Sequence, residues 1–173
     1  MNFIKRNLSF SVLCLILTAA FTFQANAQNK TTYEVLTDAA LTKVVPTSFY
    51  FAGQSAETQM RNTAAAKVGK ENYIIVGLVD TSGYSTEISG KYEGFFITDS
   101  PVKIGDKMLG TGAYGFGFTK DKINIFDLSS KQIMSIPATN DAEMKRPRPL
   151  MMTSDAKGVR LYKGKNYVLI SAK

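Results

Sequence analysis

The 173-residue chain contains no histidine and no tryptophan, and Cys14 is its only cysteine. The absence of histidine excludes Ser-His-Asp and Cys-His nucleophilic sites and histidine-ligated zinc, copper or haem. It also removes the usual general base at neutral pH. Carboxylate, lysine, tyrosine and serine–lysine chemistry stay open. The acidic residues are scattered and form no calcium-binding loop, so we predict no catalytic residue, no metal site and no cofactor.

The N-terminus has the three parts of a cleavable secretory signal peptide over residues 1–27. Lys5 and Arg6 supply the positive start, residues 8–23 form an uncharged apolar run, and Ala25-Asn26-Ala27 matches a signal-peptidase site. The apolar run is shorter than the roughly 20 residues that span a bilayer. We therefore predict cleavage after Ala27, a periplasmic or secreted protein, and no transmembrane segment in the mature chain.

Two other outcomes for the N-terminus stay open, an uncleaved anchor and a lipoprotein modified at Cys14. Lipidation usually needs a small residue before the cysteine, and Leu13 is large.

After cleavage, residues 28–173 would contain no cysteine, so the apolar core would have to stabilise the protein without disulfides. This length suits one domain, and we expect a single mostly β domain over residues 28–173.

The formal net charge of the chain is +7, and loss of Lys5 and Arg6 lowers it to +5. A positive charge favours anionic surroundings such as an envelope polymer, a lipid head group or an anionic small molecule. Solubility alone is the alternative explanation. Export argues against nucleic acid as a partner. No sequence pattern indicates the oligomeric state.

The hydrophobic pattern predicts a mainly β fold. Residues 73–79 (YIIVGLV) are apolar throughout, as in a central strand covered on both faces. At residues 113–119, aromatic residues alternate with glycine in a period of two. Lys163-Gly164-Lys165 separates two apolar runs and predicts a terminal hairpin over residues 159–171. Further strands are expected at residues 47–51, 92–98, 101–104, 107–109, 122–128, 132–136 and 150–152. Turn signals about every 8–12 residues fit either an antiparallel β-sandwich or a closed barrel.

One or two short helices complete the expected fold. Ser55 would cap a helix over residues 56–68, and Gly69 would end it. The threonines and Asn62 in this segment favour the alternative, an extended segment that leads into a turn. Residues 34–44 are a second helix candidate, because their apolar residues recur loosely at helical spacing.

Gly110, Gly112 and Gly115 spell the G-x-G-x-x-G pattern of dinucleotide-binding loops. That function needs a helix to begin at the pattern, whereas a period-two strand follows here. We interpret these glycines as permitting a turn and then the close approach of a packed group. A helix, a barrel bend or a ligand would each fit.

Asp80-Thr81-Ser82-Gly83 follows an apolar strand, as the catalytic loop of aspartic proteases does. Those proteases have glycine where Ser82 stands, and they need a second carboxylate that no other loop of this chain supplies. The alternative is a turn in which the Asp80 side chain accepts hydrogen bonds from nearby backbone N–H groups.

The densest basic segment is Lys145-Arg146-Pro147-Arg148-Pro149. Each arginine precedes a proline, whose ring disfavours the helical region for the preceding residue. The segment should therefore be stiff and extended, with two guanidinium groups available to a carboxylate, phosphate or sulfate. We predict Lys145, Arg146 and Arg148 as ligand-binding residues; an exposed connector is the alternative.

Other single residues carry weaker signals. Tyr84, Tyr92 and Tyr114 would line a ligand cavity in a barrel, and we name Tyr84 and Tyr114 as candidate ligand-binding residues. Aromatic side chains are also ordinary core material in β proteins. Arg61 and Lys67 are isolated charges that we interpret as solvated.

Several segments resemble those of small exported bacterial proteins. They are residues 53–55, 59–62, 78–84, 109–118 and 146–152. Residues 101–114 resemble a "PVxVGxxxLPAGTY" hairpin of uncharacterised secreted β-domains, including the DUF2911 type, although Gly110-Thr111-Gly112 replaces the usual Pro-Ala-Gly. The resemblance implies a secreted or envelope setting and transfers no activity.

Three hypotheses follow from the sequence. The first is an exported non-enzymatic β-domain that binds a small or anionic ligand. The second is an envelope interaction protein without a small ligand, which would expose an apolar patch or an uncapped edge strand. The third is a carboxylate-dependent hydrolase that uses Asp80.

Overall fold

The computed structural model describes residues 31–119 and 121–173. The predicted signal peptide and Cys14 lie outside these residues. The fold is mainly β, with two antiparallel sheets packed together, so the expected fold class is confirmed. Of the two arrangements that the sequence left open, the structure has the sandwich, because neither sheet closes on itself within the described residues.

The first sheet has eight strands in the order β1-β3-β4-β5-β8-β9-β10, with β2 paired to the far end of β3. Long antiparallel ladders join its neighbours, so strands close in sequence lie side by side for most of the sheet. The bounds are β1 (Tyr33–Val35), β2 (Ser48–Phe51), β3 (Gln54–Val68), β4 (Asn72–Val79), β5 (Gly94–Thr98), β8 (Gly112–Thr119), β9 (Lys122–Phe126) and β10 (Gln132–Pro137).

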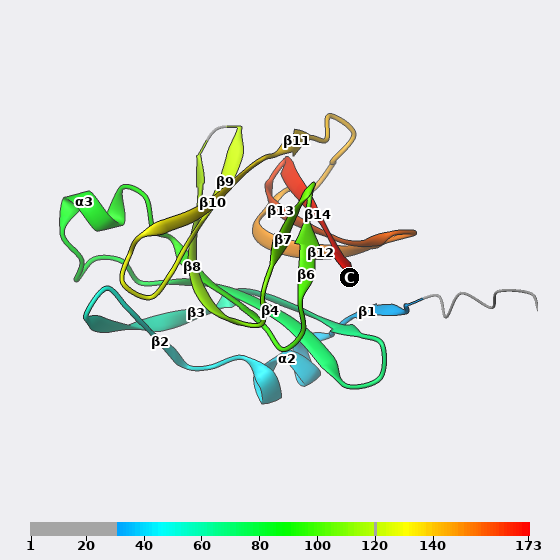
Figure 1. The fold of residues 1–173 in the computed structure, drawn as a ribbon, viewed down its shortest axis with the longest axis horizontal. Helices are drawn as coiled ribbons and strands as arrows, with labels where there is room; N and C mark the ends of the chain where they lie inside the picture. Colours follow the sequence, from blue (N-terminus) through cyan, green and yellow to red (C-terminus); the bar gives the residue numbers. More distant parts are fainter. Residues whose placement is uncertain (1–30, 120) are drawn as a thin grey trace, which may run out of the picture. The chain divides into compact units, whose positions relative to one another are not determined.

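The second sheet has six strands in the order β12-β13-β14-β6-β7, with β11 paired to β14. Figure 1 shows the C-terminal hairpin, in orange and red, beside the green hairpin β6–β7. Two short helices occur in the described residues, α2 (Asp38–Val44) and α3 (Thr86–Ser89). The strand bounds are β6 (Val102–Ile104), β7 (Lys107–Leu109), β11 (Thr139–Asn140), β12 (Arg148–Asp155), β13 (Gly158–Gly164) and β14 (Asn166–Ala172).

Apolar side chains are buried on both faces of the first sheet. The face toward the second sheet carries the main core, to which β4 contributes Ile74 and Val76. The outer face carries an aromatic cluster, to which β4 contributes Ile75 and Val79. This cluster consists of Phe49, Phe51, Tyr84, Tyr92, Phe95 and Phe126 with smaller apolar neighbours. Burial of both faces explains why residues 73–79 are apolar throughout, as the sequence predicted.

Close packing by the chain itself explains the glycines of β8. A Cβ atom on Gly115 would lie 2.3 Å from the ring of Phe51, which comes from β2. A Cβ on Gly117 would lie 2.0 Å from the carbonyl oxygen of Lys91. The group that packs closely against these glycines is therefore the Phe51 ring at Gly115 and the Lys91 carbonyl at Gly117. It is neither a helix nor a ligand. No helix begins at the G-x-G-x-x-G pattern, because Gly112 and Gly115 lie within a strand.

The predicted helix over residues 56–68 is wrong, and with it the role of Ser55 as a helix cap. These residues form most of β3, which pairs with β4 over one stretch and with β1 and β2 on its other edge. Alanine, glutamine and methionine favour a helix locally, but pairing with the apolar strand β4 outweighs that small preference. The alternative of an extended segment is correct, and Gly69 turns the chain with a φ of +64°.

The second helix candidate, residues 34–44, is correct only in its C-terminal part. The chain is helical from Asp38 to Val44, whereas Tyr33–Val35 form the edge strand β1. Pairing with the end of β3 draws these first residues into the sheet.

Candidate functional site

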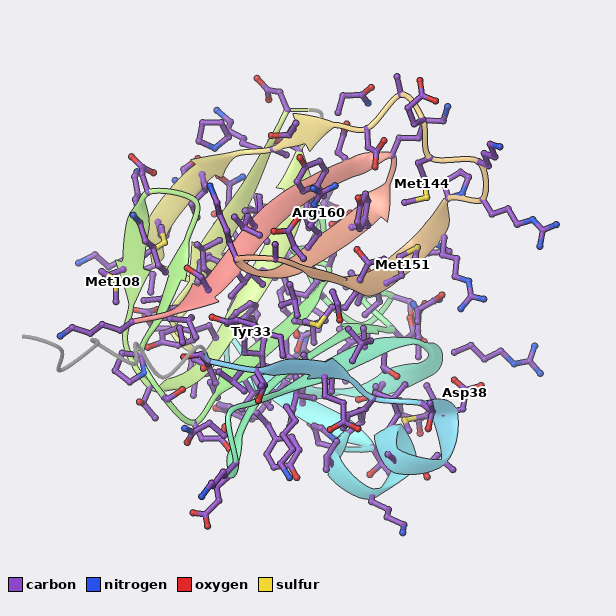
Figure 2. The ribbon with its side chains drawn as sticks, turned by 90° about the vertical axis from the view of Figure 1, so that its right-hand side faces the viewer. Tyr33, Asp38, Met108, Met144, Met151 and Arg160 are labelled. Carbon is purple, nitrogen blue, oxygen red and sulfur yellow. The ribbon has the colours of Figure 1, made fainter. Side chains whose placement is uncertain are left out.

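A groove of about 430 Å³ opens where α2, β3 and β12 come together. Figure 2 labels two of the residues that line it, Asp38 at the start of α2 and Met151 on β12. Apolar side chains form most of its wall, and two arginines and one aspartate carry its charge. The full lining is Val35, Leu36, Asp38, Leu41, Thr42, Met60, Arg61, Thr63, Ala64, Arg148, Leu150, Met151 and Met152.

A bulge in β3 brings Arg61 to the groove. Thr58 pairs with Val79, and the next paired residue is Thr63, opposite Gly77. Residues 59–62 therefore have only one residue of β4 opposite them, so the strand must bend away from its partner.

Side-chain hydrogen bonds hold this bulge in shape. The Gln59 amide donates to the Val79 carbonyl at 3.0 Å, and the Asn62 amide donates to Gln59 Oε1 at 2.8 Å. The Thr63 hydroxyl donates to the Met60 carbonyl at 2.9 Å. These bonds satisfy groups that the sheet ladder leaves without partners, and they set the position from which Met60 and Arg61 line the groove.

A second bulge, in β12, stands beside Arg148. Arg148 pairs with Gly164 and Met151 pairs with Tyr162, so β12 has one residue more than β13 across this interval. Pro149 lies in the interval, and it has no N–H to donate to the ladder. Two bulges on strands of different sheets thus place an arginine each in one groove.

The two guanidinium groups of the groove make no ion pair with any described residue, and both side chains are exposed. Arg160 gives the contrast within the same protein. It lines another depression, of about 490 Å³, but its guanidinium lies 2.7 Å from Asp155 and 4.8 Å from the centre of the Tyr167 ring. Arg160 is therefore engaged within the protein, whereas Arg61 and Arg148 are available to an anion from solution.

The structure separates the three basic residues that the sequence grouped. Arg148 lines the groove, while Lys145 and Arg146 are exposed in a bend that precedes β12. This bend is attached to the second sheet through Asp141, because the Tyr162 hydroxyl donates to Asp141 Oδ2 at 2.8 Å. Of the predicted basic residues, only Arg148 stands in the candidate site.

Arg61 is the site residue that sequence reasoning missed. As an isolated charge, Arg61 is typical of a solvated side chain, and the sequence leaves open whether the segment around it is a helix or an extended segment. In β3, the polar residues Gln59, Arg61 and Asn62 precede the apolar run of residues 64–66, and this change in composition is the one signal near the bulge. This pattern indicates a bulge only if the segment is already known to be a strand.

Tyr84 and Tyr114 do not come together in a cavity. Tyr84 is buried in the aromatic cluster of the outer face, and its hydroxyl donates to the Gln54 carbonyl at 3.1 Å. Burial raises the pKa of Tyr84. Tyr114 packs against the main core on the other face, and its hydroxyl donates to the Gly110 carbonyl at 3.1 Å. Both hydroxyls thus serve backbone carbonyls, which is a structural role.

Asp80 stabilises a surface turn. The Ser82 N–H donates to Asp80 Oδ1 at 3.0 Å, and hydrogen bonds from Ser82 lower the pKa of Asp80. Asp80 lines a depression of about 200 Å³ together with Glu57. A carboxyl that donates a proton needs a raised pKa, so the lowered pKa of Asp80 fits an ionised carboxylate and not a general acid. The described residues also contain no group of three or more acidic side chains that would hold a metal ion.

The comparisons with known proteins add no family. No protein-family model matches the chain, and neither the curated proteins nor the solved structures contain a match. The resemblance of residues 101–114 to DUF2911-type domains therefore stays a prediction. Neither helix in the described residues has the length and apolar character that crossing a membrane requires.

Proposed function

We propose that this protein is an exported, non-enzymatic β-sandwich that binds a small anionic ligand in the groove between α2, β3 and β12. One observation supports this most directly: Arg61, within the bulge of β3, and Arg148, beside the bulge of β12, line the same groove and make no ion pair among the described residues. Bulges commonly redirect side chains next to functional sites. The signal peptide predicted over residues 1–27 supports the proposal that this function belongs to the periplasm or the outside of the cell.

Native mass spectrometry would test the proposal on the protein recovered after the full chain has been expressed, exported and processed. An additional mass that is lost on unfolding supports a bound ligand and identifies its class. The intact mass of the polypeptide also tests export, because cleavage after Ala27 leaves Gln28 as the first residue. A chain that retains residues 1–27 would contradict the predicted cleavage.

Calorimetric titration with butyrate and with inorganic phosphate then tests the arginines. We expect Arg61→Gln and Arg148→Gln each to weaken anion binding by about 10-fold or more, because each removes a charge-assisted hydrogen bond. Arg146→Gln is the matched control, because this arginine is exposed in the same basic segment but does not line the groove. Equal losses in all three variants would indicate a general charge effect, and no loss in any would refute the proposed site.

A second candidate function is an envelope interaction protein. It is favoured by Leu128 and Ile133, which are 40% and 45% exposed at the end of the β9–β10 hairpin. Strand β10 also ends the first sheet, so its outer edge is open to a partner strand, apart from the Ser135 carbonyl, which accepts a hydrogen bond from Lys107. A discrete dimer or larger assembly in native mass spectrometry, without a bound small molecule, would favour this function over ligand binding.

A further inference from the structure

The walls of the groove present mostly apolar surface to a ligand. Four elements contribute to it, namely β1, α2, β3 and β12. The apolar lining residues are Val35, Leu36, Leu41, Met60 and Met151, with the largely buried Ala64, Leu150 and Met152 at the base of the wall. Burial of aliphatic surface in such a groove is favourable and roughly proportional to the area removed from water.

The hydroxyl groups in the groove are already used within the protein. Thr63 donates to the Met60 carbonyl at 2.9 Å, and Thr42 donates to the Ala39 carbonyl at 3.2 Å. Because these hydroxyl protons are used, the side chains that can donate to an anionic ligand are the two arginines, and Asp38 is the one carboxylate of the lining. A ligand that fits this lining has one charged end and an apolar remainder.

The charge of the lining favours a single negative charge on the ligand. Arg61 and Arg148 are positive and Asp38 is negative, which leaves a formal charge of +1. A monoanion neutralises this charge, whereas a dianion meets added repulsion from Asp38. A carboxylate also matches the planar fork of a guanidinium group with two parallel hydrogen bonds.

The size and softness of the groove favour one flexible chain. Its volume of about 430 Å³ lies near the lower end of the roughly 300–1,000 Å³ that small-molecule sites span. Met60 is 39% exposed and Met151 is partly exposed, so neither thioether is locked in the core. Methionine adapts its shape readily to an aliphatic partner.

We propose that the groove binds a straight-chain aliphatic carboxylate, with the carboxylate between Arg61 and Arg148 and the chain along the apolar wall. This inference rests on the proposed anion-binding function and specifies its ligand class. Binding removes the chain from water, and no covalent step is involved.

A chain-length series tests the ligand class by calorimetry. The probes are butyrate, hexanoate, octanoate and decanoate, each used below its aggregation concentration. The protein is the chain as it is recovered after export and processing. We expect affinity to rise about three- to fourfold per added methylene until the groove is filled. Decanol and decyltrimethylammonium, which carry a similar chain without the negative charge, should bind at least 10-fold more weakly than decanoate.

Variants separate the contribution of the charge from that of the chain. Arg61→Gln and Arg148→Gln should weaken all four carboxylates by a similar factor and leave the dependence on length unchanged. Met60→Ser and Met151→Ser should instead reduce the gain per methylene while sparing butyrate. Asp38→Asn should strengthen inorganic phosphate relative to octanoate. Thermal unfolding of each variant verifies that it is folded, and Arg146→Gln is again the control.

The outcomes distinguish the inference from the function on which it rests. Arginine-dependent binding that is independent of chain length overturns the inference and leaves anion binding in place. Failure of every anion to bind overturns both. Binding of decanol or the ammonium probe as tightly as decanoate overturns the role of the arginines. Binding only to anionic phosphatidylglycerol vesicles, with no affinity for free octanoate or decanoate, would identify a membrane surface instead and overturn the inference.

Discussion

Gly115→Ala offers the sharpest test of how the first sheet is covered on its outer face. The added Cβ would lie 2.3 Å from one ring carbon of Phe51 and within 2.9 Å of two others. Phe51 has no exposed surface, and its ring stacks on Tyr92 with the centroids 3.9 Å apart. The ring edge also meets Phe126, with the centroids 6.4 Å apart. The Phe51 ring therefore has no direction in which to retreat without disturbing the cluster.

The expected cost follows from overpacking, which typically destabilises a folded protein by about 1–3 kcal/mol. Alanine also restricts the unfolded chain, which offsets roughly 0.4–1 kcal/mol of that cost. We expect a net loss of about 1–2 kcal/mol in the free energy of unfolding and a Tm lower by roughly 4–7 °C. Urea denaturation, followed by tyrosine fluorescence and circular dichroism, would measure the free energy of unfolding. Thermal denaturation would measure the Tm.

A double variant attributes the loss to this contact. Phe51→Leu alone leaves space in the cluster and should cost about 1–2 kcal/mol. With the smaller leucine present, the alanine methyl group has room, so the double variant should lose at least about 1 kcal/mol less than the sum of the single losses.

Gly83→Ala is the matched control, because nothing lies within 4 Å of its added Cβ. Its stability should stay unchanged or rise by up to about 1 kcal/mol, because only the effect of alanine on the unfolded chain remains. A loss for Gly115→Ala no larger than that of the control, or strictly additive losses in the double variant, would refute the packing described here.

Three further predictions concern charged groups. Glu93 joins the sheets, since it pairs with Lys163 and accepts the Phe118 N–H at 2.7 Å. Glu93→Ala should therefore lower the free energy of unfolding by about 2 kcal/mol in urea denaturation. Hydrogen bonds from Ser129 and Lys131 lower the pKa of Asp127. This contribution to stability is present above the unfolded carboxyl pKa of about 3.9 and is lost as the pH falls further, so urea midpoints should decline below about pH 4. The Lys107 ammonium donates to the Ser135 carbonyl of edge strand β10 at 2.9 Å, so Lys107→Ala should promote self-association in light scattering.

Each of these predictions has a contrary result. A Glu93→Ala variant as stable as the parent would mean that the link between the sheets contributes nothing. Asp127→Asn should weaken the decline at acid pH, and an unchanged or rising urea midpoint below pH 4 would contradict the pKa direction. Lys103→Ala removes an exposed lysine from the neighbouring strand β6, so equal association in this control would attribute the effect to net charge.

Much of the β structure was predictable because its signal is local. Apolar residues in a period of two, or in a short continuous run, indicate strands without knowledge of their partners. Residues 73–79, 113–119 and the hairpin over residues 159–171 are strands in the structure, in agreement with the sequence. Which strands pair with one another was harder to predict, because strand pairing depends on contacts between segments that are distant in the sequence.

Segment 56–68 shows where local reasoning fails. Its side chains favour a helix by a few tenths of a kcal/mol per residue, whereas pairing with β4 supplies a ladder of hydrogen bonds and burial on both faces. The strand is thus decided by a partner that the segment itself does not encode. The choice between sandwich and barrel is of the same kind, because it depends on whether the outermost strands meet.

For the candidate site too, the sequence determined some features and the tertiary structure decided the others. By itself, the sequence determined the absence of histidine chemistry, the β class of the fold, and an arginine held by flanking prolines at position 148. Only the tertiary structure paired that arginine with Arg61, left Arg146 outside the groove, and separated Tyr84 from Tyr114. The physical reason is that a bulge forms where two strands fall out of register, and register depends on both strands and on the core between the sheets.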